Sequence, residues 1–176
     1  MKKLKLATIW LDGCSGCHMS LLDLDGALIP IVRKVDIVYG PLVDAQEFPE
    51  DVDVTLVEGA ISTQEDVERL HQIRARTKLL VSLGDCAVTG NVAAMRNVFP
   101  VNKLLHCIYV EGADADPAIP RDGLPQLAKQ ARPAQDFVKV DVCLPGCPPQ
   151  NKVIAGLLNN LLEWRKPEAN QKIKFG

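Results

Sequence analysis

The chain has 176 residues, of which 47% are hydrophobic and 24% are charged, and its formal net charge is −2. This length suits one domain with a sizeable core, so disulfides are not needed for stability. The small net charge and the scattered basic residues argue against nucleic acid or an anionic membrane as the main partner. We expect one domain over residues 1–176, with no linker and no internal repeat.

No targeting or membrane segment is recognisable in the sequence. The basic start at residues 1–5 leads into a short apolar run, which ends at Asp12 without a small-residue cleavage site. No apolar stretch is long enough to cross a bilayer. We therefore expect a cytoplasmic protein with no membrane span. In that compartment its six cysteines are better explained as thiolate ligands, catalytic groups or core residues than as disulfides.

The predicted elements alternate between short apolar strands and helices. In chain order they are a strand at 5–10, a helix at 19–32, strands at 35–39 and 52–57, a helix from Ser62 or Thr63 to about Arg76, a strand at 78–83, an irregular excursion with a short helix at 102–133, a strand at 139–143 and a helix at 153–164. Strands that are apolar throughout and alternate with helices predict a parallel sheet covered on both faces. The expected fold is a doubly wound, flavodoxin-like α/β domain.

Four cysteines directly follow predicted strands. Cys14 and Cys17 form a C-x-x-C pair after the first strand, Cys86 follows the fourth strand, and Cys147 follows the fifth. Loops at the carboxyl ends of parallel strands converge on one edge of a sheet, where such folds place their ligands. The four thiols can therefore meet in one pocket, and four thiolates are what a [4Fe–4S] cluster requires.

Cysteine content alone leaves other interpretations open. A thioredoxin-like redox pair fits the C-x-x-C motif but leaves Cys86 and Cys147 without roles. A structural zinc site uses four cysteines, although it usually pairs two C-x-x-C knuckles, and sequence spacing separates zinc from iron–sulfur only weakly. With His18 the motif also reads C-x-x-C-H, a haem attachment string, but neither an export signal nor a small helical fold accompanies it.

The remaining two cysteines lie in apolar runs. Cys107 falls within residues 104–110, and Cys143 ends the fifth predicted strand. Free cysteine is among the most buried residue types, so both are expected to pack in the core. Cys143 is the better candidate for an exception, because it precedes Cys147 by four residues and can lie beside the site.

Four strings, taken together and in order, resemble the small subunit of [NiFe] hydrogenases. They are WLDGCSGC at 10–17, VEGA at 57–60, GDCA at 84–87 and PGCPP at 145–149. The resemblance covers nearly the whole chain. It implies a flavodoxin-like fold, one [4Fe–4S] cluster held by Cys14, Cys17, Cys86 and Cys147, and a large subunit that carries the nickel–iron centre.

Departures from the family pattern narrow what the resemblance implies. Larger family members carry an export signal and a C-terminal domain with two more clusters, which are not seen here. The short, single-cluster form is similar to the small subunit of cytoplasmic, bidirectional NAD-reducing hydrogenases. There, diaphorase subunits with flavin and further clusters carry electrons to NAD. Hydrogenases that use a deazaflavin, a viologen-like acceptor or sulfur have similar small subunits. The related quinone-reductase (complex I) subunit typically has adjacent cysteines in place of C-x-x-C.

Three polar residues near the ligand strings are candidates for supporting roles. Asp12 stands where several family members carry glutamate, and a carboxylate there can relay protons or ligate iron under oxidising conditions, or simply serve the turn. Ser15 falls where many members have threonine, and its hydroxyl can bond to a sulfur or line a proton route. Glu58 ends a buried strand at the same edge, where we expect it to support the large-subunit interface. No convincing phosphate loop for a flavin on this chain is visible.

Overall fold

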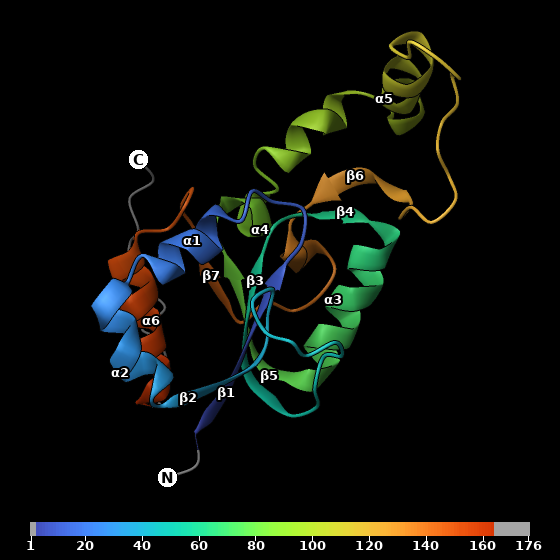
Figure 1. Cartoon of the computed structure of the whole chain (residues 1–176). Coiled ribbons are helices and arrows are strands. Elements are labelled where there is room, and N and C mark those ends of the chain that lie inside the picture. The colour runs from blue at the N-terminus through green and yellow to red at the C-terminus, as the bar shows by residue number, and fades with distance from the viewer. Residues whose placement is uncertain (1–2, 164–176) are drawn as a thin grey trace.

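The computed structural model describes residues 3–163 of the chain. Its centre is a five-stranded, all-parallel sheet with the strand order β2-β1-β3-β5-β7 (Figure 1). The strands are β1 (Leu4–Trp10), β2 (Val35–Tyr39), β3 (Val52–Glu58), β5 (Thr77–Leu83) and β7 (Val142–Leu144). The order reverses between β1 and β3, as in flavodoxin-like domains. The predicted fold class is confirmed.

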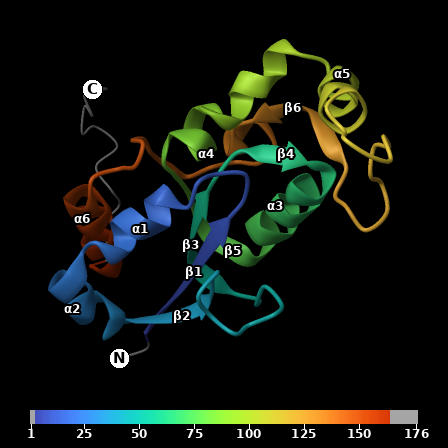
Figure 2. The ribbon, with the colours of Figure 1, turned by 45° about the horizontal axis from the view of Figure 1, so that its top comes forward.

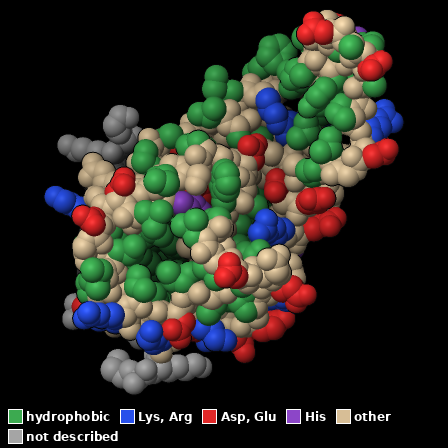
Figure 3. Space-filling view, viewed as in Figure 1, with side chains coloured by type: hydrophobic (Ala, Val, Ile, Leu, Met, Phe, Trp, Pro, Cys, Tyr) green, Lys and Arg blue, Asp and Glu red, His purple; other side chains and the backbone are tan. Residues whose placement is uncertain are grey.

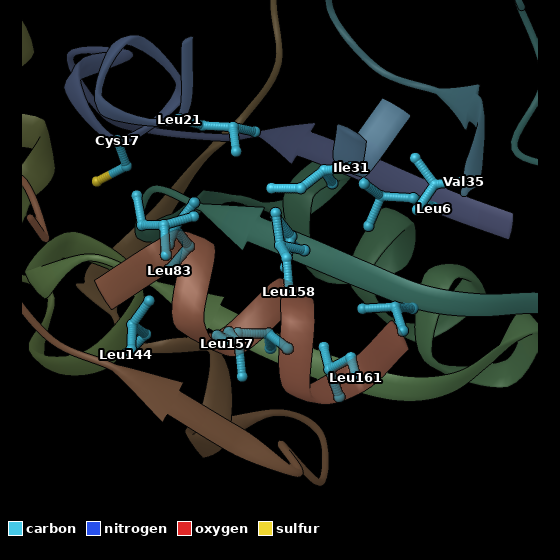
Figure 4. Close-up of a cluster of buried hydrophobic side chains, with 14 of the residues drawn as sticks. Leu6, Cys17, Leu21, Ile31, Val35, Leu83, Leu144, Leu157, Leu158 and Leu161 are labelled. Carbon is cyan, nitrogen blue, oxygen red and sulfur yellow. The ribbon is translucent and has the colours of Figure 1, made fainter. Parts of the chain in front are cut away.

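Helices cover both faces of this sheet. One face carries α1 (Gly16–Leu22), α2 (Leu28–Val32) and α6 (Asn151–Leu162), and α3 (Gln64–Arg76) lies on the other, as Figures 1 and 2 show. Each layer encloses its own cluster of buried side chains, because the strands present apolar residues to both faces. The cluster beneath α1 and α6 contains Cys17 next to aliphatic residues such as Leu83 and Leu144 (Figure 4).

The helix α3 begins where the sequence predicts, after Ser62 and Thr63. The Thr63 side chain accepts a hydrogen bond from the Asp66 N–H at 3.1 Å, and the Asp66 carboxylate accepts one from the Thr63 N–H at 2.9 Å. This reciprocal capping box satisfies N–H groups that have no partner inside the helix. Thr63 is therefore the cap, and the predicted end at Arg76 is confirmed.

Two predicted elements differ from the structure. The expected helix at 19–32 is interrupted, because Asp25 has a φ of 48°, so that α1 is followed by a 3-10 turn, η1 (Asp25–Ala27), and then by α2. The expected strand at 139–143 is replaced by the shorter β7, which begins at Val142. The last helix is confirmed as α6, although the predicted end at Trp164 lies outside the described residues.

The chain between β5 and β7, which includes the predicted excursion at 102–133, contains more regular structure than its sequence indicates. Its helical elements are α4 (Asp85–Thr89), η2 (Ala93–Val98), α5 (Val101–His106), η3 (Cys107–Glu111) and η4 (Ala134–Asp136), and β6 (Leu127–Arg132) pairs antiparallel with β4 (Ile61–Thr63). The part around α5 projects from the body in Figure 1. Asn97 fixes the base of this arm, because its side-chain amide exchanges hydrogen bonds of 2.7 and 2.8 Å with the Ala131 backbone.

The prediction that Cys107 and Cys143 are core residues is wrong, since both are exposed. Cys107 lies on the projecting arm, which packs little against the body. Cys143 is the middle residue of β7, and β7 is an edge strand of three residues with a single neighbour, β5. Alternation along β7 buries Leu144 and turns Cys143 outward. Across residues 3–163, no helix is both long and apolar enough to cross a membrane.

Asp141 links β7 to β5 and α3. Its carboxylate accepts hydrogen bonds from the Leu80 N–H at 2.8 Å and from the Arg74 guanidinium, and its own N–H donates to the Leu80 carbonyl at 2.9 Å. Burial raises the pKa of the Asp141 carboxyl, but these hydrogen bonds and the Arg74 charge outweigh burial and leave its pKa below the ordinary value. The ionised form therefore stabilises the fold.

We predict that Asp141→Asn lowers the free energy of unfolding by about 1 kcal/mol at neutral pH, because the variant loses charge-assisted hydrogen bonds that are partly exposed to solvent. Since the folded pKa is depressed, the stabilisation is complete above the unfolded pKa, about 3.9, and disappears as pH falls through the folded pKa. Denaturant titrations across this range should show the difference between variant and wild type shrinking on acidification. The control, Asp36→Asn, removes an exposed pair with Lys3 and should change little. A difference that is constant with pH would contradict the assignment.

Candidate metal centre

The four predicted ligand cysteines come together at the carboxyl edge of the sheet. The loop after β1 brings Cys14 and Cys17, Cys86 opens α4 after β5, and Cys147 follows β7. Burial raises the pKa of the Cys17 thiol far above its ordinary value, and the charges of Glu58 and of the other three cysteines raise it further. The other three thiols therefore each lie within electrostatic range of Cys17.

Exposure differs sharply among the four thiols. Cys17 is only 7% exposed, Cys86 is half-buried, and Cys14 and Cys147 are exposed. Burial also raises the pKa of Cys86, and neighbouring Cys147 and Cys14 add to that effect. The site thus has an inner wall of core residues and an outer side that opens to the surface.

Backbone hydrogen bonds join the loops that carry Cys86 and Cys147. Gly84 N–H donates to the Leu144 carbonyl at 2.8 Å, and Asp85 N–H donates to the Gly146 carbonyl at 2.9 Å. The Asp85 carboxylate completes the pair by accepting from Gly146 N–H at 2.7 Å. These bonds fix the third and fourth cysteines relative to each other.

A separate contact ties α1 to the last cysteine loop. The Ser20 hydroxyl, one turn after Cys17, donates to the Pro149 carbonyl at 2.6 Å and is buried. The helix that carries Cys17 and the loop that carries Cys147 are therefore joined directly, although 129 positions separate the two bonded residues.

Gly84 is required by space as well as by backbone conformation. Its φ is +83°, and a Cβ built on it would lie 2.2 Å from Cys17 Sγ. The same position is also 3.4 Å from the Gly146 carbonyl oxygen. A side chain at 84 would therefore occupy the space next to the innermost thiol, between the loops that carry the cysteines.

Glu58 lies beneath the C-x-x-C loop, at the end of β3, and is 1% exposed. Its carboxylate accepts hydrogen bonds from Cys17 N–H at 3.2 Å, from His18 N–H at 2.9 Å and from the His18 imidazole Nδ1. Burial raises the pKa of Glu58, but the His18 side-chain and backbone bonds and the Cys17 N–H outweigh burial and leave its pKa below the ordinary value. Glu58 is thus a buried, ionised group beneath the C-x-x-C loop.

The other two candidate supporting residues have different surroundings. Asp12 is exposed, forms a backbone bridge with Ala60, and accepts a hydrogen bond from the Ser62 hydroxyl. This supports its turn role. Ser15 has a φ of 66° at the start of α1, and its side chain does not cap that helix. The roles predicted for Asp12 and Ser15 in proton transfer stay predictions.

Sequence reasoning missed Asn91. Its side-chain amide donates to Cys147 Sγ at 3.4 Å, and a hydrogen bond from the same side chain lowers the pKa of Cys86 against the larger effect of burial. Asn91 has a φ of 37°, a conformation that asparagine tolerates better than most residues. The Gly90-Asn91 pair after α4 was the available signal, since such pairs mark turns.

Two surface hollows lie apart from the four thiols. One, of about 220 Å³, is lined by β1 and β2 residues that include Trp10 and Tyr39. The other, of about 140 Å³, lies between α1, α2 and the same strands. It has His18 in its wall, and hydrophobic side chains cover much of this side of the molecule (Figure 3). Neither hollow is lined by a cysteine. Over residues 3–163, no group of three or more His, Cys, Asp or Glu side chains is arranged to hold a single metal ion.

Comparisons with known proteins agree on one family. The family model for the NADH ubiquinone oxidoreductase 20 Kd subunit matches residues 14–161. A vhu subunit of the F420-non-reducing hydrogenase of Methanocaldococcus jannaschii is 39% identical over 171 residues, which cover 96% of this chain and 59% of that protein. NAD-reducing hydrogenase HoxS subunit delta of Cupriavidus necator is 39% identical over 168 residues, which cover 93% of this chain and 80% of that protein.

A solved structure gives the same result in three dimensions. A chain of an NAD+-reducing [NiFe]-hydrogenase in the H2-reduced state superposes with a TM-score of 0.93 and 35% identity, covering 99% of this chain and 100% of that one. The vhu relative is longer, and this chain spans less than two thirds of its length. The chain belongs to the family of the NADH ubiquinone oxidoreductase 20 Kd subunit, and within that family to the small subunits of [NiFe] hydrogenases.

Proposed function

We propose that the chain is the electron-transfer small subunit of a cytoplasmic [NiFe] hydrogenase. Residues 1–176 form a single iron–sulfur domain that holds one [4Fe–4S] cluster through Cys14, Cys17, Cys86 and Cys147. The cluster relays electrons between the nickel–iron large subunit and a diaphorase module that reduces NAD. The reaction of the assembly is H2 + NAD to proton and NADH, and this chain alone holds no complete active site. The observation that carries the proposal is the meeting of four thiols from three strand-end loops.

The residues at the site fit such a group. When bound, a cluster of this kind takes up and releases single electrons. Cys17 supplies a thiolate from within the core, and the space beside it is kept free of a side chain by Gly84. Asn91 provides a hydrogen-bond donor toward the Cys147 sulfur, a type of contact that tunes cluster potentials. The exposed Cys14 and Cys147 mark the side from which a partner subunit can approach.

A zinc-stabilised interaction module is the alternative from another class. Four cysteine ligands on zinc would place four sulfur atoms at about 2.3 Å from one ion. The hydrogenase relatives favour iron–sulfur over zinc.

The choice of electron acceptor is based on the relatives of this chain. NAD is supported by the HoxS subunit delta relative and by the NAD+-reducing hydrogenase structure, which matches this chain over its full length. Other relatives are named as subunits of an F420-non-reducing hydrogenase, a coenzyme F420 hydrogenase and a sulfhydrogenase, so a deazaflavin, a viologen-like acceptor or sulfur is the second candidate. A complex I subunit is a further candidate through the family model, and the C-x-x-C pair counts against it.

The ligand set predicts the outcome of Cys86→Ser in the complex purified anaerobically from its native source. We expect assembled subunits with little hydrogen-driven NAD reduction, because one of four cluster ligands is lost. Iron and labile sulfide analysis, together with EPR of the reduced complex, should show a damaged or missing cluster. Cys107→Ser is the matched control, since Cys107 is exposed on the arm. Normal turnover by Cys86→Ser would contradict the assignment, and a wild-type protein with zinc and no iron or sulfide would refute the function.

A second prediction concerns Gly84→Ala. The new methyl group would overlap Cys17 Sγ, at 2.2 Å, so we expect the assembled complex to lose the iron of the small-subunit cluster and to keep the iron of the partner subunits. Gly123→Ala is the matched control, because Gly123 also has a positive φ, +72°, but nothing lies within 4 Å of a Cβ there. The control also places a side chain at a positive φ, where glycine is favoured, and it should retain its iron. Equal iron contents in the two variants would show that the space beside Cys17 is not needed.

A further inference from the structure

Beyond the four thiols, the site contains a buried pair that the ligand set does not use. His18 is 7% exposed and Glu58 is 1% exposed. Each comes from a different element, α1 and β3, and the two side chains are joined through His18 Nδ1 and a Glu58 carboxylate oxygen. Burying two polar side chains is costly unless they satisfy each other or another group. Their position next to Cys17 indicates which group they serve.

Glu58 supplies the cap that α1 lacks in its own sequence. The first N–H groups of any helix have no partner within it. Ser15, which precedes α1, makes no side-chain cap. The Glu58 carboxylate instead accepts from the Cys17 and His18 N–H groups, at 3.2 and 2.9 Å. The backbone of Cys17 is therefore held by a carboxylate from a strand 41 positions away.

His18 fixes that carboxylate. Its Nδ1 bonds the same Glu58 oxygen that accepts the His18 N–H. The other ring nitrogen, Nε2, is buried and has no hydrogen-bond partner among the described residues. His18 also borders the 140 Å³ hollow, whose wall is mainly aliphatic. Glu58 is thus the polar partner that orients the imidazole, and the imidazole in turn restrains Glu58.

We propose that His18 is a positioning residue for the iron–sulfur cluster, acting through Glu58 to set the hydrogen bonding and the charge around Cys17. This inference rests on the proposed function. The buried carboxylate places a negative charge beside the innermost ligand, and net charge and hydrogen bonds near a cluster set its reduction potential. The contact between His18 Nδ1 and Glu58 holds that carboxylate in place. A merely structural His18 would affect folding and leave the potential unchanged.

The pair predicts a specific pattern of reduction potentials. Glu58→Gln keeps the shape but removes the charge, so the potential should become more positive. His18→Leu keeps bulk but removes the imidazole donor, so the Glu58 carboxylate keeps only its two backbone N–H donors. The potential should then become more negative. In His18→Asn the amide nitrogen is bonded to Cγ, in the same position as Nδ1 of histidine. This variant should therefore have the wild-type reduction potential.

The double variant decides whether His18 acts through Glu58. If it does, adding His18→Leu to Glu58→Gln should leave the potential of Glu58→Gln unchanged, because coupled residues are not additive. His71→Leu is the control, since His71 is an exposed histidine on α3. Its potential should equal that of the wild type.

The measurement is an EPR-monitored redox titration of the assembled complex, after iron and sulfide analysis of each variant. Loss of iron in His18→Leu that His18→Asn reverses also supports positioning. The inference would be overturned if His18→Leu shifted the reduction potential equally in the wild type and in the Glu58→Gln variant. A wild-type potential in iron-loaded His18→Leu would overturn it as well. So would a shift in His18→Asn as large as that in His18→Leu. A wild-type complex whose small subunit lacks iron would instead refute the proposed function, which keeps the two failures separate.

Discussion

The carboxylate of Glu58 is the contact on which the site's inner wall depends. Glu58 is the last residue of β3, and its buried carboxylate caps α1 and orients His18 beneath the C-x-x-C loop. A charged group in such a place is stable only because several donors converge on it. The same convergence fixes the backbone of Cys17, so the stability of the fold and the geometry of the site depend on one residue.

Other hydrogen bonds join the remaining loops that carry the cysteines. Asp85 joins the Cys86 and Cys147 loops, and Ser20 joins α1 to Pro149. Together with Glu58 they connect elements that are far apart in sequence. Cys17 belongs to the core cluster beneath α1 and α6, so its position is determined by close packing as well as by hydrogen bonds (Figure 4).

The arm after α4 shows how an irregular segment is held without a core of its own. Arg96 donates to the carbonyls of Ser62 and Ala128, at 3.1 and 3.0 Å, and Asn97 pairs with the Ala131 backbone. These side chains satisfy backbone groups of β4 and β6 that lie outside the hydrogen bonds of that strand pair. Because Cys86 lies in the first turn of α4 and the chain continues through Asn91 into this arm, the arm's base and the site share one continuous stretch of chain.

The sequence by itself determined the parallel α/β fold, a cap for α3 at Ser62 or Thr63 and the four cysteines after strand ends, because apolar runs, capping residues and chain order are local properties. The split of the helix at Asp25, the β4–β6 pair and the outward turn of Cys143 were decided by tertiary structure, since edge position and packing override local preference. The same is true of Asn91 and of the His18–Glu58 pair. Each acts on a residue far away in sequence, and only the folded chain brings such partners within hydrogen-bond distance.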